Sequence, residues 1–225
     1  MLALGLDTSC ATASLGLFDD EGRIAPRSIP SPPVHSERLL LTLRHVLQEA
    51  GVGVKDLDLV ACACGPGSFT GLRVGMATAR GLGLAIGCPV LGFSTLETIA
   101  IASVAPSSDA SRVTVLMDAG RGQVYRGRYL VASGTARLLH PEAAVAIDDA
   151  LRDAADGLVV HGEGLGESAI LGAVLRGLGS IPAPPIGETL ARRGAALCSG
   201  ATGGALPPLI PNYLRASDAE KTATT

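Results

Sequence analysis

Apolar and polar positions along the first half of the chain follow two periods, one typical of strands and one of helices. Aliphatic residues recur at helical spacing over residues 36–50, where they share one face, and Gly51 follows as a C-terminal stop. Short apolar runs bounded by polar turns precede and follow this helix. The pattern predicts the order βββαβαβα, with elements at residues 2–7, 12–18, 23–30, 36–50, 57–64, about 68–87, 89–92 and 94–104.

The second half begins after a polar stretch rich in proline and serine at residues 105–111. It opens as the first half does, with a strand that ends in an aspartate, Asp118 matching Asp7, and a second strand soon after. This is the sequence signal of an internal repeat. We therefore expect two subdomains, 1–105 and 106–225, the second smaller or degenerate with a frayed tail. Its predicted elements are strands 112–118, 123–131 and 158–161 and helices 167–177 and 188–198.

Composition limits the class of protein. The chain is 47% hydrophobic and 17% charged, which favours a packed core over disorder. The longest apolar stretch is interrupted by Arg80 and Glu97, so no membrane span is expected, and without a readable signal peptide we expect a cytoplasmic protein. The five cysteines lack metal-ligand spacing and are expected to be free thiols. A net charge of -3 and the absence of Trp argue against tight direct binding of RNA.

A glycine-rich turn joins the strand at 57–64 to the next helix. A turn of this kind at a helix N-terminus suits anion binding, because unpaired N–H groups and the helix dipole point the same way. The nucleotide fingerprints do not fit, since the turn lacks the Gly-Lys pair of a P-loop and has Thr70 where a dinucleotide loop needs glycine. The alternative is a structural turn, with Ser68 or Thr70 capping the helix. The turn residues are Gly65, Gly67, Ser68, Thr70 and Gly71.

The helix that follows this turn carries a small residue at every fourth position, in the series Gly71, Gly75, Ala79, Gly83 and Gly87. Such a stripe allows another backbone to approach closely, and that packing must offset the low helix propensity of glycine. The opposite side mixes arginine, methionine and aliphatic residues, which suits a partner surface better than bulk solvent. A solvated helix face is the alternative. The predicted partner surface comprises Arg73, Met76, Ala77, Arg80, Gly81 and Leu84.

Together these segments resemble the bacterial TsaB family. The resemblance covers most of the chain and rests on residues 4–9, 65–75, 94–97, 118–125 and 213–215. It implies two RNase H-like subdomains of the actin-like ATPase (ASKHA) superfamily, an α/β fold with mixed five-stranded sheets flanked by helices, once called glycoprotease-like. In active members, the aspartates at the positions of Asp7 and Asp118 lie beside phosphates and metal. Here the resemblance implies degenerate phosphate-loop positions, namely Asp7, Thr8, Ser9 and Asp118.

The family resemblance also implies a function. TsaB is a subunit of the machinery that makes threonylcarbamoyladenosine beside the tRNA anticodon, and its active paralogue TsaD carries a metal-binding His-x-x-x-His where this chain has Thr95 and Ile99. A hydroxyl and an alkyl group cannot replace two imidazoles as metal ligands. The resemblance therefore implies a non-catalytic scaffold without a metal or cofactor of its own, and leaves open a nucleotide at the interface of the complex. The implied partners are TsaD and TsaE, tRNA only through the complex, and a second copy when alone.

Two other functions stay open from the sequence. An active ATPase or small-molecule kinase of the same superfamily would use Asp7 and Asp118 and complete its site with second-half glycines, namely Gly162, Gly164 and Gly166. A glycoprotease-type peptidase is disfavoured, because the chain has no His-Glu-x-x-His and its four histidines lie in no nucleophile motif.

Overall fold

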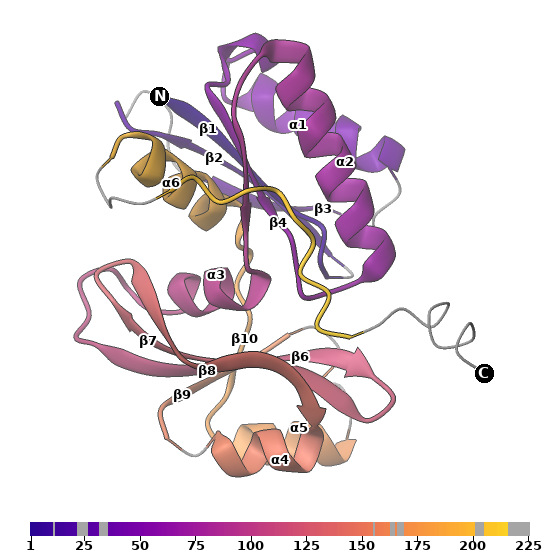
Figure 1. Cartoon of the computed structure of the whole chain (residues 1–225), viewed down its shortest axis with the longest axis vertical. Helices are drawn as coiled ribbons and strands as arrows, with labels where there is room; N and C mark the ends of the chain where they lie inside the picture. The colour runs from indigo at the N-terminus through magenta and orange to yellow at the C-terminus, as the bar shows by residue number, and fades with distance from the viewer. Residues whose placement is uncertain are drawn as a thin grey trace. The chain divides into compact units, whose positions relative to one another are not determined.

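A computed structural model describes residues 1–10, 12–21, 27–31, 36–154, 156–162, 165, 169–200 and 205–215. These residues form two compact units (Figure 1). The first combines Met1–Thr98 with Pro185–Pro211, and the second combines Ile99–Pro184 with the segment that begins at Asn212. This division differs from the predicted halves, 1–105 and 106–225, because a late segment returns to the first unit. The predicted frayed tail lies outside the described residues.

The first unit is built on a mixed sheet of five strands in the order β3-β2-β1-β4-β5. The first three strands pair antiparallel, whereas β1, β4 and β5 run parallel, so that Leu4 faces Leu17 on one side and Val60 on the other. The predicted strands of this unit are confirmed, as β1 Leu2–Asp7, β2 Ala13–Asp19, β3 Arg27–Ser31, β4 Leu59–Ala63 and β5 Val90–Phe93.

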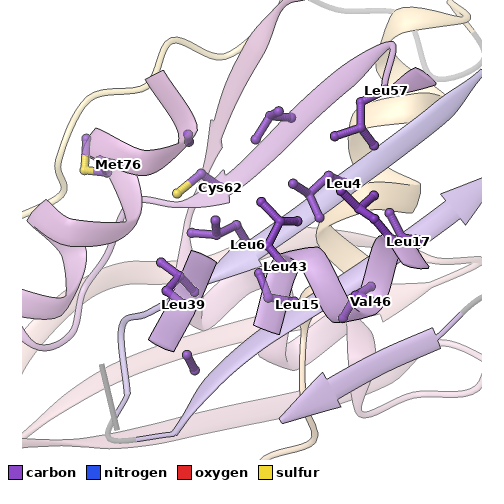
Figure 2. Packing of buried hydrophobic residues seen from close by; sticks show 14 of the residues in the cluster. Leu4, Leu6, Leu15, Leu17, Leu39, Leu43, Val46, Leu57, Cys62 and Met76 are labelled. Atoms are coloured by element: carbon purple, nitrogen blue, oxygen red, sulfur yellow. The ribbon is translucent and has the colours of Figure 1, made fainter. Parts of the chain in front are cut away.

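One face of this sheet packs against α1 (Ser36–Glu49) and α2 (Phe69–Ile86). Alternate strand residues meet the apolar faces of these helices, and burial of such aliphatic side chains is the main stabilising contribution to a fold of this kind. A short 3-10 helix (Val54–Asp56) precedes β4, and α3 (Thr95–Ala102) follows β5. Figure 2 shows the core, which includes Leu4, Leu6, Leu15, Leu17, Leu39, Leu43, Val46, Leu57, Cys62 and Met76.

The other face of the sheet is covered by α6 (Gly187–Cys198), which comes from the end of the chain. A Cβ atom on Gly5 would lie 1.8 Å from the carbonyl oxygen of Gly187, and one on Gly16 would lie 2.1 Å from the amide nitrogen of Glu188. The amide of Gly187 also donates to Ser14 Oγ at 2.9 Å. Backbone packs directly on backbone here, which only glycine permits. This contact explains why residues 185–211 belong to the first unit.

The second unit repeats the topology of the first. Its strands lie in the order β10-β9-β6-β7-β8, with β8, β7 and β6 antiparallel and β6, β9 and β10 parallel. Two such sheets confirm the predicted pair of RNase H-like subdomains. The strands are β6 Ser111–Gly120, β7 Gln123–Ala132, β8 Thr135–Ala146, β9 Leu158–His161 and β10 Ile181–Pro182, and the helices are α4 Ile147–Asp153 and α5 Ala169–Gly177.

Candidate functional site

The glycine turn lies against the end of β1. The amide of Ser68 donates to the carbonyl of Ser9 at 2.7 Å, and a Cβ atom on Gly67 would lie 2.4 Å from that same oxygen. On its other side the turn accepts a bond from the amide of Thr95, which donates to the carbonyl of Gly65 at 2.8 Å. Gly65 has a φ of 111°, a conformation that favours glycine. The turn is therefore wedged between β1 and the start of α3.

Ser68 is the residue that caps α2. Its Oγ accepts a hydrogen bond from the amide of Gly71 at 3.2 Å, and its carbonyl accepts one from Leu72 at 2.8 Å. Thr70, the other predicted cap, lies exposed in the first turn of the helix. Because the cap uses amide donors that an anion would need, these contacts favour the structural interpretation of the turn over a phosphate cradle.

The polar residues at the end of β1 are buried and bonded within the first unit. Asp7 is 5% exposed, and its Oδ1 accepts a hydrogen bond from the amide of Ser9 at 2.8 Å. Thr8 Oγ1 donates to the carbonyl of Gly71 in α2 at 2.8 Å. Burial, together with the nearby Asp7 carboxylate, raises the pKa of the Cys62 thiol well above its usual value. Cys62 is thus a protonated core residue, and all five cysteines are free, as expected.

Asp118 forms the same kind of turn in the second unit. Its Oδ1 accepts a hydrogen bond from the amide of Gly120 at 2.7 Å, which matches the bond between Asp7 and Ser9. Arg215 donates to the carbonyl oxygens of Ala119 and Gly120. Burial raises the pKa of the neighbouring Tyr125, an effect that Arg215 opposes and Asp118 reinforces. The carbonyls of this hairpin therefore face a cation that belongs to the chain itself.

The metal-binding positions of the active paralogue are buried in α3. Thr95 is fully buried and Ile99 is 2% exposed, and neither side chain offers a nitrogen or carboxylate ligand. Among the residues that the structure describes, no group of three His, Cys, Asp or Glu side chains could hold a metal ion. The donor set does not fit the metal of the paralogue. Of the glycines considered for a kinase site, Gly164 and Gly166 lie outside the described residues.

The small-residue side of α2 packs on β1 and β5. A Cβ atom would lie 2.0 Å from the carbonyl oxygen of Thr8 at Gly71, 2.1 Å from Thr8 Oγ1 at Gly75, and 2.3 Å from Val90 Cγ2 at Gly83. The predicted close packing is confirmed at these positions. Gly87 differs, because it adopts a φ of 75° at the C-cap, where nothing would lie within 4 Å of a Cβ atom, and so it ends the helix.

The outer side of α2 is exposed at all but one of the predicted surface positions. Leu84 is 87% exposed, the most of the large hydrophobic residues that the structure describes, and Arg73 stacks 3.8 Å above the centre of the Phe69 ring. Met76 departs from the prediction. It is 5% exposed and belongs to the same core cluster as Cys62, because it follows Leu72 by one helical turn on the inward side (Figure 2). The exposed members are Arg73, Ala77, Arg80, Gly81 and Leu84.

Further exposed apolar residues on the helices were missed by the sequence reasoning. Leu40 and Leu41 in α1 are 51% and 64% exposed, and Phe69 at the start of α2 is 38% exposed. A signal existed for the first two, since leucines 39, 40 and 41 are consecutive and cannot all point to the same side of a helix. No helix of the described part of the chain is long and apolar enough to cross a membrane.

Comparison with known proteins gives concordant matches. The sequence model of the family described as "TsaD: tRNA N6-adenosine threonylcarbamoyltransferase" matches residues 22–170. The tRNA threonylcarbamoyladenosine biosynthesis protein TsaB of Escherichia coli is 35% identical over 129 residues, which cover 57% of this chain and 55% of that protein. TsaB of Bacillus subtilis is 30% identical over 66% of this chain and 64% of its own length. The chain thus matches somewhat over half the length of these curated relatives.

Among solved structures, YeaZ from Pseudomonas aeruginosa has a similar fold over nearly the whole chain. The two superimpose with a TM-score of 0.72 at 31% sequence identity, and the match covers 95% of this chain and 99% of that one.

Proposed function

Because the chain belongs to the TsaD family, and within it to the TsaB proteins, we propose that it acts in tRNA threonylcarbamoyladenosine biosynthesis as a non-catalytic scaffold subunit. The observation that carries the proposal is the similarity to the TsaB proteins of Escherichia coli and Bacillus subtilis, and the match to YeaZ extends the shared fold to 95% of this chain. We propose that the chain binds a TsaD protein, that TsaE joins through TsaD, and that tRNA is bound only by the complex. Alone, the chain would pair with a second copy, in the cytoplasm.

The state of the two aspartate turns supports a role without catalysis. In each turn the carboxylate accepts a bond from the backbone amide two residues later, so that amide is not offered to a ligand. Thr95 and Ile99 in α3 supply no metal ligand. These features argue against phosphoryl or carbamoyl transfer by this chain on its own.

The outer side of α2 supports a role in docking. The inward side of the helix is fixed by contacts with β1 and β5 that leave no room for a Cβ atom, so the exposed side is presented by a rigid element. Ala77 and Gly81 have little or no side chain, so they leave this side of the helix flat, and Leu84 projects from it with 87% of its surface exposed. A flat surface with one projecting apolar side chain suits a helix of a partner protein. We propose that TsaD, or a second copy of the chain, binds there.

The test is to place a charge at Gly81. Nothing lies within 4 Å of a Cβ atom at this position, so Gly81→Glu fits the folded chain and removes a glycine from a helix interior. We expect unchanged or slightly higher stability, loss of at least about tenfold in affinity for the cognate TsaD, and less modified adenosine in an assay reconstituted with the chain. Affinity is measured by co-purification and titration calorimetry.

Gly177→Glu is the matched control, because Gly177 also has open space around it and lies at the end of α5 in the second unit. It should leave TsaD binding intact. Retained binding in Gly81→Glu would contradict the proposed surface. Turnover of ATP by the chain alone, abolished by Asp7→Ala, would instead favour the ATPase or kinase alternative.

A further inference from the structure

Residues 205–211, which follow α6 after a short interval and are called the strap here, lie along the first unit (yellow in Figure 1). Leu209 is 7% exposed and belongs to the core of this unit. The amide of Ile210 donates to the carbonyl of Pro208 at 2.9 Å, which closes a tight turn around Leu209. On either side of this buried residue, Leu206 and Ile210 are 48% and 61% exposed. The strap is thus anchored by one side chain and presents two others.

The strap covers the outer edge of β5, the last strand of its sheet. The amide of Gly92 donates to the carbonyl of Pro207 at 3.2 Å, and a Cβ atom on Gly92 would lie 2.7 Å from the carbonyl oxygen of Pro208. The backbone of the strap can therefore approach β5 this closely only because Gly92 has no side chain. Pro207, Pro208 and Pro211 have no N–H group, so at these positions the strap offers no donor for a further strand.

Arg80 joins the strap to α2. Its Nη2 donates to the carbonyl oxygen of Leu209 at 2.8 Å. Arg80 precedes Leu84 by four residues, so the two lie on the same side of the helix. Arg80 is therefore committed to the chain's own backbone, and the strap runs beside the exposed side of α2.

We propose that Arg80 and the strap form a clasp that holds the edge of the first unit closed and completes the docking surface of α2. Arg80 is then a positioning residue, which places the strap beside α2, and the strap adds Leu206 and Ile210 to the apolar surface offered to TsaD. The closed edge is a property of the chain alone, whereas the contribution to docking rests on the proposed function.

The test compares three variants in the full chain. Arg80→Met removes the donor and keeps much of the apolar stem, Arg80→Lys keeps a donor, and Arg73→Met is the control on the same side of α2. Hydrogen exchange of the Gly92 amide, followed by NMR, reports the clasp directly, with the Leu4 amide of the central strand as internal reference. We expect exchange at Gly92 to be about tenfold faster in Arg80→Met and nearly normal in Arg80→Lys.

Affinity for TsaD is measured on the same proteins. We expect Arg80→Met to weaken binding severalfold and Arg80→Lys to restore most of it, while Arg73→Met weakens binding and leaves Gly92 exchange unchanged. Unchanged Gly92 exchange in Arg80→Met would overturn the clasp. Faster exchange of the Gly92 amide in Arg80→Met, with unchanged affinity for TsaD, would overturn the contribution of the clasp to docking. If wild-type protein failed to bind TsaD, the proposed function would fall, and Gly92 exchange would still decide whether the clasp exists.

Discussion

Glycines in α2 serve opposite purposes, depending on which side of the helix they occupy. Gly75 lies where a Cβ atom would be 2.1 Å from Thr8 Oγ1, whereas nothing lies within 4 Å of such an atom at Gly81. The first glycine allows the helix to approach β1, and the second leaves the exposed side of the helix flat. The difference is invisible in a helix propensity scale, which assigns both the same cost.

Substitution by alanine separates these two roles. Gly81→Ala should stabilise the chain by about 0.5–1 kcal/mol, because alanine is the better helix former and fits without contact. Gly75→Ala should destabilise it by about 1–3 kcal/mol, because the new methyl group forces α2 away from Thr8. Urea unfolding of both variants measures the difference. Equal effects of the two substitutions would show that packing at Gly75 is not limiting.

Spacing along the sequence predicted the small-residue stripe and offered Ser68 as one of two caps, because both depend on neighbours within a few residues. It placed Met76 wrongly, since this residue lies at the border between the two sides of the helix and its burial depends on how α2 rotates against the sheet. The bond from Arg80 was beyond local reasoning, because its acceptor is 129 residues away along the chain. Long-range contacts of this kind leave no periodic signal.

At the scale of elements, one arginine ties α6 to the start of α3. Arg193 donates to Thr98 Oγ1 at 2.6 Å and to Glu97 Oε2 at 2.5 Å, and its guanidinium lies 4.6 Å from the centre of the Phe93 ring. The side chains of Arg193 and Glu97 are only 16% and 29% exposed. A partly buried, charge-assisted contact of this kind is stronger than a surface ion pair.

A pair of double-mutant cycles tests this difference. Arg193→Met combined with Glu97→Gln should show a coupling free energy of about 1–2 kcal/mol in urea unfolding. The control is Arg192 with Glu188, an i,i+4 pair on the same helix with side chains 51% and 31% exposed, which should couple by less than about 0.5 kcal/mol. Similar coupling in both pairs would mean that burial adds nothing to the contact of Arg193.

The elements that the sequence predicted are those whose apolar pattern is strong. The strands of the first unit are almost fully buried where burial is described, and α1 and α2 each have a continuous apolar side. The long strand β8 was missed because none of its residues is buried, and its apolar residues do not alternate with polar ones as in a half-buried strand. The two-residue strand β10 is too short to have any pattern.

At the scale of the molecule, the repeat predicted from Asp7 and Asp118 is confirmed by two sheets of the same topology. The predicted division into consecutive halves could not anticipate that α6 would return. Gly187 and Gly194 of α6 pack closely on the face of the first sheet that α1 and α2 leave uncovered. Glycine patterns so far apart in the sequence could not predict this fit, because it depends on two surfaces that exist only in the folded chain.

Fragments can test the dependence of the first unit on α6. A protein of residues 1–105 leaves Leu59 and Ala61 without the helix that covers them, and we expect poor NMR dispersion and binding of hydrophobic dyes. Addition of a peptide of residues 185–211 should restore dispersed spectra. A peptide with Gly187→Leu should fail, because the side chain would strike the backbone of Leu15 and Gly16. A well-ordered fragment without any peptide would contradict this dependence.

The late return of α6 also sets an order of events during translation. The sheet of the first unit is synthesised early, yet the helix that covers its second face begins only at Gly187. At about 5–20 residues per second, the ribosome needs roughly 5–20 seconds to make the stretch between them. The second unit has almost its whole sequence, Ile99–Pro184, available within that interval. The sheet that leaves the ribosome first therefore waits for the helix that covers its second face until most of the second unit has been made.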